Sequence, residues 1–201
     1  AAFRARCPDR LGAEIDAAID EGVAALRRAQ RPDGSWRGTS GVYFLSGTRA
    51  AVRGLRAGGV PAVDPQIRRA CAWLKERQRA DGGWGEHASS VRSDRYVEHE
   101  EPQVVQTAWA LSALLEAEDP EWGAVERAAA FLASAQREDG TWPAQDPDGL
   151  LPSGALVARG LAPRVAALFA LGTYARRARE RALADPLPRE RPRPSPDRVV
   201  H

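Results

Sequence analysis

The side chains best suited to binding a metal ion lie in one polar stretch, residues 85–101. His87 and the run 98–101, which reads Glu-His-Glu-Glu, supply imidazole and carboxylate groups. These are usual ligands of zinc and related metals. A zinc site also needs ligands at the spacing of a turn or helix, with partners that orient them. Only the loose pair His87 and His99 with a Glu approaches this, so the pattern favours a solvated loop. We predict neither a metal site nor a cofactor.

Carboxylic acids that could donate a proton are present, but they form no acid motif. Asp16 and Asp20 lie on a predicted helix, and Glu118 and Asp119 stand beside another. Charged residues in such places are usually solvated. The chain also has no Gly-rich phosphate loop after a strand and no constellation of Ser, His and Asp. Its two cysteines form neither a disulfide framework nor a zinc pattern. We therefore predict no catalytic residue in this chain.

The strongest pattern is a motif, Gln-x-x-Asp-Gly-x-Trp, that occurs three times. Each copy follows an apolar stripe with the i, i+3, i+4, i+7 spacing of one buried helix face. The last residue of each stripe is a Leu four positions before the Gln. The three sets are Gln30, Asp33 and Trp36; Gln78, Asp81 and Trp84; and Gln136, Asp139 and Trp142. Each unit is thus a helix, a Gln at its end, an Asp-Gly turn and a Trp.

The chemistry of this unit is structural. A Gly just past the last helical turn relieves the steric cost of a left-handed cap, and a buried Trp removes about 150–250 Å² from water. The Gln amide can bond to backbone groups at the helix end while its flat face lies against the indole. Repeats of this length indicate stacked helical arrays, because one unit cannot bury its apolar face alone. We expect Trp36, Trp84 and Trp142 to be buried, each against a Gln of a repeat.

The repeats must be positioned by helices in two layers. The expected helices are 13–29, 45–57, one opened by Asp64-Pro65, 103–117, one opened by Asp119-Pro120, and 153–181 with a break or kink at Pro163. An Asp followed by Pro is a good helix start. Helix 103–117 is apolar nearly all round, which is typical of burial on every side. The sequence therefore predicts an all-α fold in which three outer helices alternate with three inner ones.

With these motifs in this order, the chain resembles the class II triterpene cyclases. The resemblance runs from about residue 17 to about residue 174 and is closest to the C-terminal third of bacterial squalene–hopene cyclases. It is carried by Gln30–Trp36, Gly47-Thr48, Gly54–Ala57, Asp81–Glu86, Gln106–Leu111, Gln136–Trp142 and Ala170–Tyr174. It implies a partial α/α toroid, half of an α6/α6 barrel built from helical hairpins with Gln-Trp motifs. The implied activity is carbocationic cyclisation of a polyprenyl or triterpene substrate.

The resemblance also implies which residues line the cavity. Carried over without gaps, the family's cavity positions fall on Ser40, Tyr43, Ser46, Leu151, Ala155, Val157, Arg159 and Ala162. Family aromatics are replaced at most of these positions, which weakens the stabilisation of cations and argues against squalene as substrate. The family's proton donor, an Asp-x-Asp-Asp motif N-terminal to the matched region, does not occur in these 201 residues. We expect this chain alone to be inactive.

The expected domain organisation has three parts. Residues 1–12 read as a connection, residues 13–181 as the C-terminal part of the barrel domain, and the Pro/Arg-rich residues 182–201 as a disordered tail. The chain starts with Ala and has no Met, so it reads as a piece of a longer protein. We expect two partners, an isoprenoid substrate and the missing N-terminal half of the toroid, on the same or another chain.

Composition leaves the location and two other functions open. The net charge of +2 gives no indication of nucleic-acid binding. No apolar run approaches the ~20 residues of a membrane span, and no signal peptide is visible. We expect a cytoplasmic protein, with peripheral association at the inner membrane surface left open. One alternative is a non-catalytic helical-repeat module that binds a partner through its open edge. The other is a prenyltransferase β-subunit, although its zinc ligands are not visible.

Overall fold

The computed structural model describes residues 12–39, 41–151, 153, 155–158 and 160–184. Its elements in chain order are α2 (Gly12–Ala29), α3 (Phe44–Ala57), α4 (Pro65–Glu76), α5 (Ser90–Ser93), α6 (Val104–Glu116), α7 (Trp122–Ser134), β1 (Gly149–Leu150), β2 (Leu156–Val157) and α8 (Ala162–Ala184). The predicted all-α fold is confirmed, since the described strands are two residues long each. None of the described helices is both long and apolar enough to cross a bilayer.

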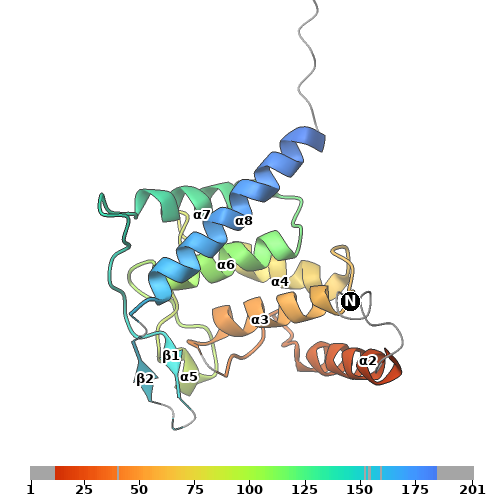
Figure 1. The fold of residues 1–201 in the computed structure, drawn as a ribbon. Coiled ribbons are helices and arrows are strands. Elements are labelled where there is room, and N and C mark those ends of the chain that lie inside the picture. The colour runs from red at the N-terminus through yellow and green to blue at the C-terminus, as the bar shows by residue number, and fades with distance from the viewer. Residues whose placement is uncertain (1–11, 40, 152, 154, 159, 185–201) are drawn as a thin grey trace, which may run out of the picture.

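Helix α6 lies at the centre of the molecule (Figure 1). Every residue from Val104 to Leu115 is buried, because the helix is apolar on all its faces. It packs against α3, α4, α7 and α8. Helices α3 and α8 join it as inner helices, and α2, α4 and α7 form the outer layer. The predicted alternation of outer and inner helices is therefore present.

The two Asp-Pro pairs link neighbouring outer helices, and Asp64 is the N-cap of α4. The Asp64 carboxylate accepts a hydrogen bond from the Gln66 backbone N–H at 2.8 Å and pairs with Arg27 of α2 at 2.7 Å. The Asp119 carboxylate accepts one from the Glu121 N–H at 2.8 Å and pairs with Lys75 of α4. Asp119 is 7% exposed, so its predicted solvation is wrong. Its charge is balanced by the Lys75 ion pair and the Glu121 N–H. The prediction that Asp119-Pro120 opens the following helix is wrong, because α7 begins at Trp122 with Glu121 as its N-cap.

The segment before the last helix differs from the prediction. A helix was expected from residue 153, but β1 and β2 form an antiparallel hairpin that pairs Gly149 with Val157. Helix α8 begins only at Ala162. Pro163 does not kink it. Pro163 stands in the first turn, where its missing N–H costs no helical bond, and Gly160 just before it favours a break in the helix.

Helix α8 also runs further than expected, to Ala184. Residues 182–184, which the sequence placed in the tail, are therefore helical. The rest of the predicted tail, 185–201, and nearly all of the predicted connection, residues 1–11, lie outside the described residues. A second unpredicted element is the short helix α5 within the polar stretch 85–101.

Candidate functional site

The three repeat turns have the same geometry. In each, the Asp carboxylate accepts a hydrogen bond from the backbone N–H two residues on at 2.9–3.0 Å. The Gly that follows the Asp adopts a positive φ of 95°, 88° or 77°. The indole N–H donates to the carbonyl of the Leu ten residues earlier at 2.7–2.8 Å. Trp36, Trp84 and Trp142 are 2%, 0% and 7% exposed, as predicted.

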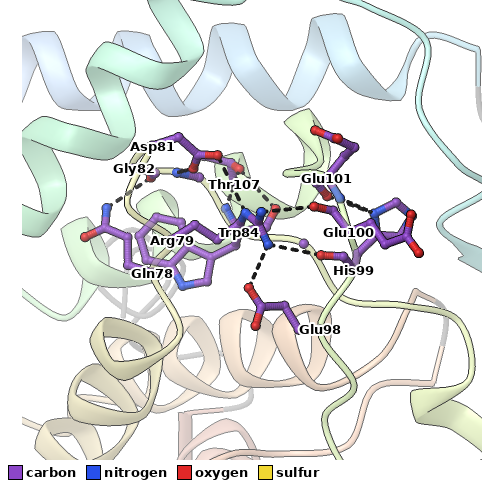
Figure 2. Close-up of polar contacts among 12 residues, drawn as sticks. Gln78, Arg79, Asp81, Gly82, Trp84, Glu98, His99, Glu100, Glu101 and Thr107 are labelled. Carbon is purple, nitrogen blue, oxygen red and sulfur yellow. Dashed lines mark hydrogen bonds and ion pairs between the residues drawn. The ribbon is translucent and has the colours of Figure 1, made fainter.

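The Gln side chains join one outer helix to the next. Gln30 donates from Nε2 to the Gly34 carbonyl at 3.0 Å and to the Gln66 carbonyl in α4 at 2.9 Å. The middle unit repeats this arrangement. Gln78 Nε2 donates to the Gly82 carbonyl (Figure 2) and to the Ala124 carbonyl in α7. In the third unit the bond to Gly140 is present at 3.0 Å. Contact between each indole and a repeat Gln stays a prediction.

The repeat turns also fix the inner helices. The backbone N–H of Trp36 donates to Thr48 Oγ1 of α3 at 3.1 Å. The N–H of Trp84 donates to Thr107 Oγ1 of α6 at 2.9 Å. The first two turns therefore each connect the outer helix before them to the inner helix after them, and in this way position α3 and α6.

A buried carboxylate holds the start of α3. The Glu86 oxygens accept hydrogen bonds from the backbone N–H groups of Tyr43, Phe44 and Leu45 at 2.9–3.0 Å. Its side chain is 1% exposed. Burial raises the pKa of Glu86, while the three N–H donors oppose that change. Because these donors occupy the carboxylate and it lies outside the hollow described next, Glu86 is a structural group, not a proton donor to a ligand.

A hollow of about 600 Å³ lies between the three inner helices. Its size is typical of small-molecule sites, and its lining is mostly apolar. It is formed by Arg49, Val105, Ala108, Trp109, Ser112, Gly160, Leu161, Ala162, Val165, Ala166 and Phe169. The aromatic rings of Trp109 and Phe169 could stabilise a positive charge on a ligand. The arrangement therefore suits an apolar ligand in which a cation develops.

The cavity residues predicted from the sequence are only partly brought together. Ala162 lines the hollow. Tyr43 and Ser46 lie at the start of α3, where the Ser46 hydroxyl donates to the Tyr43 carbonyl at 3.1 Å. The remaining described positions are Leu151 and Ala155, both exposed, and Val157 in β2.

The expectation that these three residues share one inner helix with Ala162 is wrong, because β1 and β2 pair Gly149 with Val157 and Leu150 with Leu156, and α8 begins only at Ala162. Ser40 and Arg159 lie outside the described residues. Whether the predicted positions line a cavity in a larger assembly stays a prediction.

Apart from Ala162, the residues that line the hollow were missed as site residues. Trp109 was assigned only to a buried helix, and Phe169 was not considered. Arg49 lies four residues after Leu45 and three before Val52, so it stands on the buried stripe of α3. A charged residue on an apolar stripe is the signal that could have identified it.

The polar stretch 85–101 is tied to the middle repeat turn. Arg79 binds Glu98 at 2.7 Å and the carbonyls of His99 and Glu100 at 3.1 and 3.0 Å (Figure 2). His99 also pairs with Asp146 at 2.9 Å. Among the described residues, no group of three or more His, Cys, Asp or Glu side chains could hold a metal ion.

Comparisons with family models, with other sequences and with solved structures all match this chain to terpene cyclases. Residues 9–176 match the family model of the squalene-hopene cyclase C-terminal domain. A lanosterol synthase of Aspergillus fumigatus is 37% identical over 85% of this chain, and a probable squalene–hopene cyclase of Sinorhizobium fredii is 43% identical over 64%. Among solved structures, ent-copalyl diphosphate synthase from Streptomyces platensis is similar over 85% of this chain, with a TM-score of 0.57 and 25% identity.

The matched regions are parts of longer proteins. This chain spans 23% of the Aspergillus enzyme, 20% of the Sinorhizobium protein and 30% of the Streptomyces structure. The helical layers, the family match and these relatives agree with one another, and they show part of an α/α toroid of the terpene cyclases. The chain belongs to the squalene–hopene cyclase C-terminal domain family of class II terpene cyclases.

Proposed function

We propose that this chain forms one wall of a cavity in which an isoprenoid chain is folded and cyclised through carbocations. The observation that carries the proposal is the apolar hollow between α3, α6 and α8. Relatives named as squalene–hopene cyclases and lanosterol synthases support an isoprenoid ligand. The wall would orient the chain, exclude water and present the Trp109 and Phe169 rings to the developing cation.

The proton donor is proposed to lie outside this chain. Protonation of an alkene or epoxide starts the cyclisation, each new C–C bond moves the cation along, and loss of a proton or addition of water ends it. Two described carboxylates that could be considered as proton donors already have partners. Glu86 accepts hydrogen bonds from backbone N–H groups at the start of α3, and Glu118 pairs with Arg56 at 3.1 Å. Asp16 and Asp20 lie on the outer helix α2.

The other half of the toroid is proposed to cover the open side of the inner helices. Leu161, just before helix α8, and Val165 and Leu168 within it are 66%, 64% and 68% exposed, and a face of this kind is normally covered. The third repeat supports the same idea. Whereas Gln30 and Gln78 each bond to a following outer helix, the described residues include no outer helix after the third turn at Gln136, only the inner helix α8.

The location of the protein is part of the proposal. Isoprenoids dissolve in membranes, and the apolar face of α8 could receive them at the inner membrane surface while the protein remains peripheral. We propose that the division into a connection before residue 13, a barrel segment and a tail also holds, with the barrel segment extended to Ala184.

Product analysis by mass spectrometry tests the function. The chain is incubated with squalene and with shorter polyprenols, both alone and together with the N-terminal half of the toroid. We expect no cyclised product from the chain alone and a cyclic product from the reconstituted form. Trp109→Leu should lower the yield at least about tenfold, and Val63→Ala, an exposed residue outside the hollow, should not. Absence of product from every reconstituted form would favour the non-catalytic module.

A further inference from the structure

The hollow contains a charge that an apolar ligand would not match. Among the described residues that line it, Arg49 is the only charged one. The Nε atom of Arg49 is buried, and no acceptor among the described residues binds it. Burial lowers the pKa of Arg49, yet a guanidinium keeps its proton in proteins. The wall thus presents a poorly compensated cation beside an apolar surface.

The neighbouring carboxylate compensates this charge only in part. Glu116 is the acidic group that acts on Arg49, but its Oε1 lies 3.8 Å from the Nε of Arg53. Its other oxygen is buried and has no hydrogen-bond donor among the described residues. One carboxylate therefore serves two arginines, and a net positive charge remains next to the hollow. Burying an uncompensated charge is costly, so an anion that reaches Arg49 would be favoured.

A neutral hydrocarbon would gain nothing from Arg49, and a carbocation close to it would be repelled. A ligand with an anionic head and an apolar chain fits both parts of the hollow. The head would accept hydrogen bonds from the guanidinium, which matches phosphate oxygens in geometry. The chain would lie against Trp109 and Phe169.

Building on the proposed function, which supplies the isoprenoid chain, we propose that the hollow binds an isoprenoid phosphate or diphosphate ester. Arg49 holds the phosphate head, and the apolar lining of α6 and α8 holds the chain. Arg49 is a specificity-determining residue in this proposal, because it selects ligands that carry a phosphate over alcohols and hydrocarbons of the same length.

Calorimetric titration of the purified chain tests the proposal. The ligands are geranylgeranyl diphosphate, geranylgeraniol and inorganic diphosphate, all below the concentration at which they aggregate. We expect the prenyl diphosphate to bind at least about tenfold more tightly than the alcohol, as expected for a charge-assisted contact, and more tightly than inorganic diphosphate. Arg49→Gln should abolish the preference for the diphosphate and change the affinity for the alcohol less than about twofold.

Matched variants separate the possible outcomes. Arg49→Lys keeps the charge and should retain part of the preference. Arg28→Gln removes an exposed charge on the outer helix α2, which does not line the hollow, and it should retain all of the preference. Circular dichroism melts verify that each variant is folded. Equal binding of diphosphate and alcohol to the wild type, or a preference that survives in Arg49→Gln, would overturn the inference.

Two further measurements distinguish the inference from the function on which it rests. Phe169→Ala should weaken diphosphate and alcohol alike. If neither prenyl ligand binds at all, the proposed isoprenoid site itself fails. Vesicles of phosphatidylcholine with or without phosphatidic acid test a lipid phosphate as the source of the head group. Arg49-dependent binding to phosphatidic acid without binding of soluble prenyl diphosphate would refute the isoprenoid ester.

Discussion

At the scale of single residues, the indole of each repeat is an anchor with two attachments. Trp84 is fully buried, its ring N–H donates to the Leu74 carbonyl, and its backbone N–H donates to Thr107. One residue therefore joins the end of α4 to the start of α6. Removing the Trp84 side chain exposes apolar surface and leaves the Leu74 carbonyl, at the end of α4, without its hydrogen-bond donor.

We predict that Trp84→Ala lowers the free energy of unfolding by about 3–5 kcal/mol, as other buried aromatic truncations do. Urea denaturation followed by circular dichroism measures this change. Trp122 is the matched control, because it is only partly buried and stacks on Tyr174 with ring centroids 6.1 Å apart. Trp122→Ala should cost clearly less. A loss below about 1 kcal/mol for Trp84→Ala would contradict the anchoring role.

The ion pair at the start of α4 predicts a pH dependence. The hydrogen bond from Arg27 lowers the pKa of the Asp64 carboxyl, and the bond from the Gln66 N–H adds to this effect. A carboxyl whose pKa is lower in the folded state stabilises the fold above its unfolded pKa of about 3.9. That stabilisation is lost as the pH falls through the folded-state pKa.

Asp64→Asn keeps an oxygen that can cap the helix but removes the charge. The wild type should therefore lose more stability than this variant between about pH 6 and about pH 3. Denaturant melts across this range measure the difference. Parallel curves for the two proteins would show that the Arg27 pair contributes no pH-dependent stability.

At the scale of elements, close backbone approach fixes how one outer helix follows another. A Cβ atom at Gly34 would lie 2.6 Å from the Arg69 carbonyl of α4, and at Gly82 it would lie 2.5 Å from the Arg127 carbonyl of α7. At Gly140 the nearest atom is the Gln136 Nε2 at 4.0 Å. The glycines of the first two turns thus permit a contact that the third turn does not make within the described chain.

We predict that Gly82→Ala destabilises the fold more than Gly140→Ala does. Both substitutions place a side chain at positive φ, which costs about 1–2 kcal/mol, but only the first also displaces a helix backbone. The difference should be at least about 1 kcal/mol in urea melts of the two variants. Equal losses would indicate that contact with α7 does not depend on the small size of Gly82.

The elements that the sequence predicted well are those determined by residues close together in the chain. The Asp-Gly turns, the Asp64 helix start and the all-round apolar helix α6 each follow from a few neighbouring residues. The pairing of β1 with β2 was missed because the family's last inner helix was carried over without gaps. Such short strands also leave little periodicity to detect.

The candidate site depends more on tertiary packing than on local pattern. Ala162 was identified, but Arg49 and Phe169 were not, because they reach the hollow only when α3 and α8 pack on either side of α6. The resemblance implied cavity positions within residues 40–46 and 151–162. Of these, Ala162 lines the hollow, which the structure forms around the first turns of α8, and a cavity role for the others stays a prediction.

At the scale of the whole molecule, the described chain is a wall of helices with one side open. The outer helices are linked through Gln side chains, the inner helices hold the hollow, and α8 extends past them (Figure 1). The open side combines the apolar face of α8 with a third repeat turn that no described outer helix follows. These features are consistent with a segment that spans about a quarter of its relatives.

The central claim is that the hollow between the inner helices receives the isoprenoid chain. Photocrosslinking tests it most directly, with a diazirine near the end of a prenyl chain and peptide mapping by mass spectrometry. We predict adducts on α6 at Val104–Glu116 and at the start of α8, and loss of these adducts when unlabelled ligand competes. Adducts confined to the outer helices α2, α4 and α7, or unaffected by competitor, would contradict the claim.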